Sequence, residues 1–101
     1  MRNFFCLLFI IALAPAAFAQ KITLSGKVID KETKEPLPFA SLGIKGKAIG
    51  TITNLQGEFD FHIPAELRND LFTLSMLGYK SYEAPVWTLL EIKPLVIEVD
   101  K

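Results

Sequence analysis

Apolar and polar residues alternate most clearly over Gly57–Ile63. The polar residues of this segment separate three apolar positions, which predicts a strand with one buried face carrying Phe59, Phe61 and Ile63. The β-branched residues Thr51, Ile52 and Thr53 precede it and suit a half-buried strand. Asn54 and Gly57 are typical of a tight turn between two such strands. The pattern therefore predicts a β-hairpin whose core face is already assigned.

The same alternation recurs along the chain between turn signals rich in glycine and proline. It predicts seven short strands, over Ile22–Val28, Phe39–Lys45, Ala48–Thr53, Gly57–Ile63, Leu71–Leu77, Tyr79–Val86 and Lys93–Asp100. Ala65–Asn69 is long enough for one helical turn, and Trp87–Ile92 is compatible with a loop, a short helix or an irregular edge. Seven strands of this length predict an all-β fold, a seven-stranded antiparallel β-sandwich.

The first nineteen residues have a different character. Arg2 is followed by the apolar run Phe4–Ala14 and by Ala17-Phe18-Ala19, an A-x-A cleavage pattern. Residues 1–19 are therefore predicted to be a signal peptide, and residues 20–101 the exported domain, with no membrane span after cleavage. The only cysteine, Cys6, lies in the signal, so the mature chain is expected to contain no disulfide.

Composition narrows the possible partners. Removal of Arg2 from the 11 basic residues leaves ten, against 11 acidic residues. With a formal charge of minus one and no basic run, nucleic acid is not expected as a partner.

The chain offers little catalytic chemistry. His62 is the only histidine and is predicted on the polar face of its strand, whereas a catalytic zinc needs three protein ligands. Asp30, Glu58 and Asp60 lack the spacing of a calcium-binding loop. We expect no catalytic residues, no metal site and no cofactor, so the protein is predicted not to be an enzyme.

Four blocks in order give the chain a family resemblance, and they are Leu24–Asp30, Glu35–Leu42, Gly50–Phe59 and Leu74–Tyr79. The chain resembles the carboxypeptidase-regulatory-like domain, which has a transthyretin-like (prealbumin-like) sandwich fold. The residues that carry the resemblance have structural roles in turns, close approaches and the core, and they are Gly26, Pro36, Gly50, Thr51, Thr53, Asn54, Gly57, Phe59, Gly78 and Tyr79. We expect Gly26 to face the core close to a neighbouring strand and Gly57 to adopt a positive φ.

The resemblance implies an exported protein of Gram-negative bacteria, periplasmic, secreted or associated with the outer membrane. It implies either the N-terminal extension of a TonB-dependent receptor or a small stand-alone domain. The zinc site of carboxypeptidases lies in a separate peptidase domain, so no catalytic residue carries over.

Two binding interpretations follow, beside a purely structural role. An exposed edge strand can pair with a protein partner. Alternatively, Tyr82 and Trp87 form a carbohydrate-binding surface. We expect instead that Trp87 closes the open end of the core, because a small domain seldom leaves a large ring unused. A supporting role for a separately encoded peptidase is a further alternative.

Overall fold

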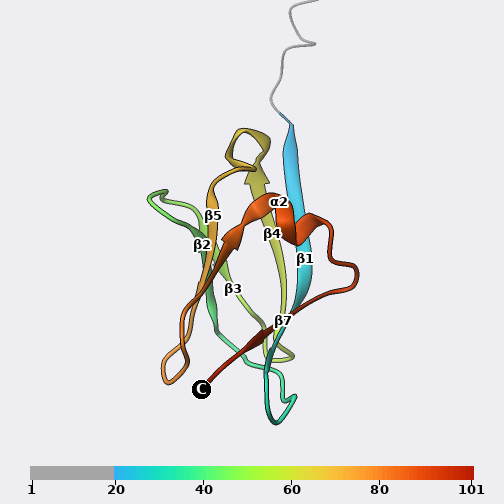
Figure 1. Cartoon of the computed structure of the whole chain (residues 1–101), viewed down its shortest axis with the longest axis vertical. Helices are drawn as coiled ribbons and strands as arrows, with labels where there is room; N and C mark the ends of the chain where they lie inside the picture. The colour runs from blue at the N-terminus through green and yellow to red at the C-terminus, as the bar shows by residue number, and fades with distance from the viewer. Residues whose placement is uncertain (1–19) are drawn as a thin grey trace, which may run out of the picture.

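The computed structural model describes residues 20–101, which form two β-sheets packed face to face (Figure 1). The strands are β1 Lys21–Asp30, β2 Ser41–Ile44, β3 Gly50–Ile52, β4 Glu58–Pro64, β5 Leu71–Ser75, β6 Tyr82–Pro85 and β7 Leu95–Val99. Two short helices join them, the 3-10 turn η2 (Ala65–Leu67) and α2 (Val86–Leu90). The predicted signal peptide, residues 1–19, lies outside the described residues. Within the described part, neither helix has the length and apolar character that a membrane crossing requires.

One sheet has three strands in the order β4-β1-β7, and the other has four in the order β3-β2-β5-β6. The predicted seven-stranded sandwich is therefore confirmed. The prediction that it is wholly antiparallel is wrong, because β1 and β7 pair in parallel, from Gly26 opposite Leu95 to Asp30 opposite Val99. Local alternation gives no direction of pairing, and parallel neighbours must be far apart in sequence, as these two are.

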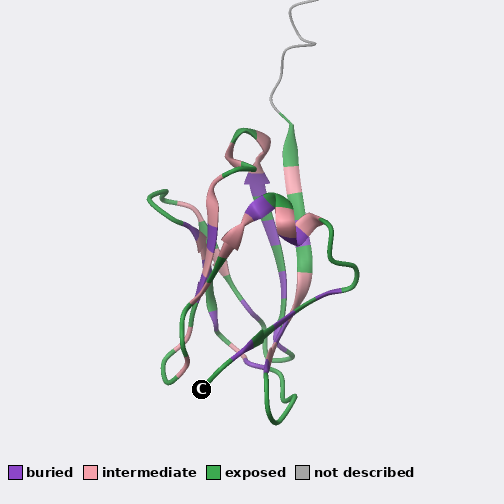
Figure 2. Ribbon diagram, viewed as in Figure 1, coloured by how far each residue is buried: buried purple, intermediate pink, exposed green. Residues whose placement is uncertain are grey.

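The core lies between the sheets and is built from alternate strand residues, as Figure 2 shows. On β4, Phe59, Phe61 and Ile63 are buried while the intervening residues are exposed, as predicted. On β7, the same alternation buries Leu95, Ile97 and Val99. The apolar side chains of both sheets therefore meet in one layer.

The predicted hairpin is wrong in its pairing. β3 and β4 are joined by a tight turn, but β3 pairs with β2 and β4 pairs with β1, so the turn crosses from one sheet to the other. A short turn between two β-patterned segments fits either arrangement, because the alternation assigns a face and not a partner.

Several boundaries differ from the prediction. The second strand starts at Ser41 because Phe39 has a φ of 61° and lies 62% exposed. The sixth strand begins at Tyr82, since residues 76–81 form a loop around Gly78, whose φ is 88°. The ambiguous segment Trp87–Ile92 lies largely in the helix α2, which begins one residue earlier at Val86, and Val86 and Leu89 are buried.

Candidate functional site

The turn between β3 and β4 is organised by Asn54. Its side-chain Oδ1 accepts hydrogen bonds from the backbone N–H of Gln56 at 3.0 Å and of Glu58 at 2.9 Å. Its own backbone N–H donates to the carbonyl of Glu58 at 2.9 Å. Gly57 completes the turn with a φ of 75°, as predicted. Asn54 thus supplies hydrogen-bond partners for both the backbone N–H and the backbone carbonyl of Glu58.

Thr53 is a polar residue buried in the core, with 1% of its surface exposed. Its hydroxyl donates to the carbonyl of Leu37 at 2.7 Å and accepts from the N–H of Ala40 at 2.9 Å. Both bonds hold the segment that leads into β2, in which Phe39 has its positive φ. The role of Thr53 is therefore structural, since a buried hydroxyl with two partners is satisfied within the fold.

Two of the glycines permit close approaches between strands. A Cβ on Gly26 would lie 2.5 Å from the carbonyl oxygen of Leu95, so the predicted collision with a neighbouring strand is present. A Cβ on Gly57 would lie 2.6 Å from the carbonyl oxygen of Val28, in addition to its unusual φ. These residues set how near β7 and the turn can come to β1.

The remaining motif residues also lie in the framework. Gly50 and Thr51 belong to the edge strand β3, and Phe59 is buried on β4. Pro36 is exposed and forms an isolated antiparallel bridge with Ile29 of β1. Gly50 and Thr51 line a small groove together with Asp60 and His62, whereas Pro36 and Phe59 do not reach it.

A polar cluster that the sequence analysis missed joins Asp30 to Tyr79. Asp30 is only 4% exposed at the end of β1, and its Oδ2 accepts a hydrogen bond from the hydroxyl group of Tyr79 at 2.8 Å. Its Oδ1 accepts the backbone N–H of Glu32 at 2.8 Å and of Thr33 at 3.0 Å. The hydrogen bonds from Thr33, Tyr79 and Glu32, in that order, lower the pKa of Asp30 although burial opposes them. The same contact with Asp30 raises the pKa of Tyr79.

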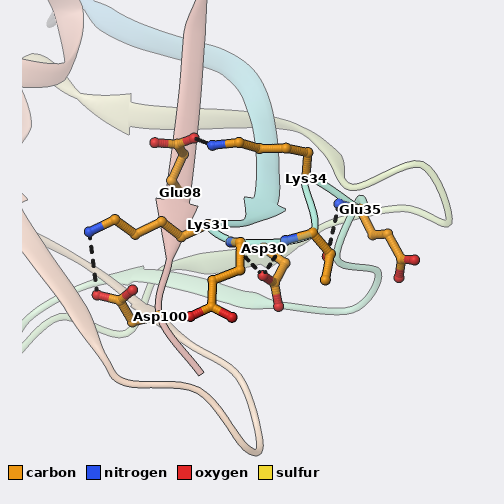
Figure 3. A network of polar contacts seen from close by, with 8 residues as sticks. Asp30, Lys31, Lys34, Glu35, Glu98 and Asp100 are labelled. Atoms are coloured by element: carbon orange, nitrogen blue, oxygen red, sulfur yellow. Dashed lines mark hydrogen bonds and ion pairs between the residues drawn. The ribbon is translucent and has the colours of Figure 1, made fainter.

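Charged side chains surround this cluster at the end of β7 (Figure 3). Lys34 pairs with Glu98, and Lys31 lies 3.8 Å from Asp100. The Lys101 ammonium lies 5.9 Å from the centre of the Tyr79 ring. These exposed pairs each contribute little to stability. In this cluster Tyr79 connects the loop after β5 to the end of β1. Both carboxylate oxygens of Asp30 accept hydrogen bonds from within the chain.

The outer face of the three-stranded sheet carries cross-strand polar pairs. Ser25 Oγ donates to Asp60 Oδ1 at 2.5 Å, and Thr23 Oγ1 lies 3.1 Å from His62 Nδ1. Both pairs are exposed, as predicted for His62. Within residues 20–101, no group of three or more His, Cys, Asp or Glu side chains is arranged to hold a metal ion.

A groove of about 1290 Å³ runs along residues of β1, β4, α2, the segment that enters β7 and the start of β7, and it is also lined by Phe39 and by residues 52–54. Its charged side chains are two lysines, Lys27 and Lys93, and two carboxylates, Glu58 and Asp60. The charges balance, so the groove does not select a cationic or an anionic ligand by charge.

The aromatic residues predicted as a ligand surface have different environments. Trp87 lies on α2 and is 42% exposed, so the expectation that it closes the core is wrong, and Val86 and Leu89 take that place. Tyr82 is half-buried and meets Phe72 edge-on, with ring centres 6.4 Å apart. Its ring is therefore partly used in packing rather than wholly presented to solvent.

The edge of β4 is an open strand edge. The Val28 N–H donates to the carbonyl of Gly57 at 2.8 Å. Because hydrogen-bonded pairs alternate along an antiparallel ladder, Phe59, Phe61 and Ile63 are the β4 residues that bond to β1. Backbone groups of Asp60 and His62 consequently point away from β1. A groove of about 350 Å³ lies beside this edge and is also lined by residues 48–51 that lead into and include the start of β3.

Comparison with known proteins identifies the family of this chain. A sequence profile of the CarboxypepD_reg-like domain matches residues 24–95. The chain therefore belongs to the CarboxypepD_reg-like domain family. It is also 40% identical over 70 residues to the TonB-dependent receptor SusC of Bacteroides thetaiotaomicron. That alignment covers 69% of this chain and 7% of the receptor, so the chain corresponds to a small part of that protein. No solved structure matches the chain significantly.

Proposed function

We propose that the protein is an exported, non-catalytic interaction module of a TonB-dependent receptor system, which binds a protein partner by strand pairing at the edge of β4. The similarity to a TonB-dependent receptor supports the association and the export. The observation that carries the binding mode is the open edge at Asp60 and His62, which lies beside a groove. A partner strand placed there would gain main-chain hydrogen bonds from groups that β1 does not use.

The other edges of the sandwich are less suited to strand addition. β3 has three residues, and β6 ends at Pro85, which has no N–H to donate. On β7, the Lys34–Glu98 ion pair places charge beside the strand. β4 is seven residues long, and its Glu58 is already bonded to Asn54, so added pairing would begin at Asp60.

A proline at position 62 tests the binding mode. The N–H of His62 points away from β1, so His62→Pro removes a donor from the open edge without removing a β1–β4 hydrogen bond. We expect His62→Pro to lose co-purification with the outer-membrane TonB-dependent receptor while retaining the fold by circular dichroism. His62→Ala, which keeps the N–H, is the matched control and should still co-purify. Equal receptor binding by both variants would contradict the proposal.

Carbohydrate binding is a second candidate, and the 42% exposure of Trp87 favours it. An exposed indole offers a flat apolar face on which a sugar ring can stack. Titration with soluble oligosaccharides, followed by Trp87 fluorescence, tests this function. This tryptophan is the only one in the chain, so a spectral shift would report its site directly.

A further inference from the structure

The first and last strands of the sandwich are parallel neighbours. β1 begins at Lys21, β7 ends at Val99, and the five pairs between them run from Gly26–Leu95 to Asp30–Val99. Because the strands run in the same direction, residue 20 and residue 101 lie at opposite ends of the sandwich (Figure 1). A force applied between these two residues is therefore directed along both strands.

This geometry determines how the hydrogen bonds between β1 and β7 are loaded. When parallel neighbours are pulled at opposite ends, they slide past each other, and all the hydrogen bonds between them are strained together. When antiparallel neighbours are pulled at the same end, the bonds open one after another. The pair β1 and β4 offers the second case, since Lys21 lies opposite Pro64.

The C-terminal end of β7 is held by further contacts. The N–H of Lys31 donates to the carbonyl of Val99 at 3.0 Å, and the N–H of Lys80 donates to the carbonyl of Asp100 at 2.7 Å. The ion pairs of Lys31 with Asp100 and of Lys34 with Glu98 lie at the same end. These contacts keep the last residues from peeling away sideways before the ladder is loaded.

β1 is also well placed to carry such a load. It is the central strand of its sheet, with seven residues paired to β4 and five paired to β7. Gly26 lets β7 approach closely where the parallel ladder begins. The strand that receives the force is thus supported on both sides.

From this arrangement we infer that the domain is a mechanical clamp, a link that resists tension along the chain far better than its thermodynamic stability alone indicates. The clamp is the parallel β1–β7 ladder with the contacts of Lys31 and Lys80 at its end. The clamp resists tension applied between residue 20 and residue 101, along the direction of both strands. The inference is independent of the binding mode proposed for β4.

Single-molecule force spectroscopy with two pulling directions tests this inference. The full chain with Cys6→Ser offers no native thiol, so pairs of introduced cysteines define the attachment points. Lys21→Cys with Lys101→Cys pulls β1 and β7 in shear. Lys21→Cys with Glu66→Cys pulls at neighbouring ends of β1 and β4 and opens their ladder in sequence. All three positions are exposed.

We expect the unfolding force at one loading rate to be a few-fold higher for the 21–101 pair than for the 21–66 pair, because forced unfolding follows the barrier along the pulling direction. Equal melting temperatures of the two proteins would show that direction and not stability causes the difference. Forces that are equal, or lower for the 21–101 pair, would overturn the inference.

Discussion

The hydroxyl group of Tyr79 donates a hydrogen bond to Asp30 Oδ2 at 2.8 Å, across a separation of 49 residues. This hydrogen bond joins the loop after β5 to the end of β1, and the same carboxylate caps the turn through Glu32 and Thr33. A carboxylate that accepts several hydrogen bonds favours its charged form. The contact therefore links the stability of this end of the sandwich to pH.

The pH dependence has a definite sign. Because the pKa of Asp30 is lowered in the folded state, its contribution to stability is present above the carboxyl's ordinary pKa of about 3.9 and is lost as the pH falls through the lower folded value. We expect Asp30→Asn to have a lower urea midpoint than the parent at pH 7, with the gap narrowing below about pH 4. A gap that is constant from pH 7 to pH 2.5 would contradict this role.

The role of Asp30 was not predictable from the chain. The sequence shows an acidic residue at the start of a charged turn, which is ordinarily exposed, and nothing local places Tyr79 beside it. By contrast, the turn roles of Asn54 and Gly57 were predictable because their chemistry acts within five residues. Local interactions can be inferred from a sequence, whereas a contact over 49 residues depends on the topology.

A comparison of substitutions at Gly57 and Gly46 distinguishes the cost of an unfavourable φ from the cost of a steric collision. Both have a positive φ, but a Cβ on Gly57 would meet the Val28 carbonyl at 2.6 Å, whereas a Cβ on Gly46 would meet nothing within 4 Å. Gly46→Val should cost about 1–2 kcal/mol in the free energy of unfolding through φ alone. Gly57→Val should cost at least about 1 kcal/mol more, because it adds overpacking. Denaturant melts of both variants check this, and equal losses would refute the collision.

Phe61 and His62 are adjacent on β4 and face opposite sides of the sheet. Phe61 is 3% exposed and packs near Phe72, with ring centres 6.2 Å apart. Phe61→Ala should lower the free energy of unfolding by about 3–5 kcal/mol. His62→Ala should stay within about 0.5 kcal/mol, since its side chain is exposed. Similar urea midpoints for the two variants would show that the face assignment is wrong.

Strand β4 also shows what the alternation of apolar and polar residues can and cannot predict. It assigned the buried faces of β4 and β7 correctly, because a period of two decides which side chains share a face. It did not identify β1 as the partner of β4, nor the parallel pairing of β1 with β7. Exposure of Trp87 was missed for a related reason, since Val86 and Leu89 on α2 are equally apolar and fill the core instead.

The prediction that the protein is not an enzyme can be tested on purified protein. His62 and Thr23 form an exposed pair, and we expect them neither to bind zinc nor to activate a nucleophile, because a catalytic zinc needs three protein ligands. Elemental analysis should therefore find far less than one equivalent of zinc, and a peptide and ester substrate screen should show no turnover. Zinc near one equivalent, or turnover that His62→Ala abolishes, would make the protein an enzyme.

Site-specific photo-crosslinking in cells tests the central claim, that the β4 edge binds a receptor protein. A photoreactive amino acid at position 62 lies on the exposed β4 edge, and one at position 87 lies on α2 as the matched control. We predict a crosslink from position 62 to a TonB-dependent receptor and none from position 87. No crosslink from position 62, or a receptor crosslink from position 87 alone, would contradict the account.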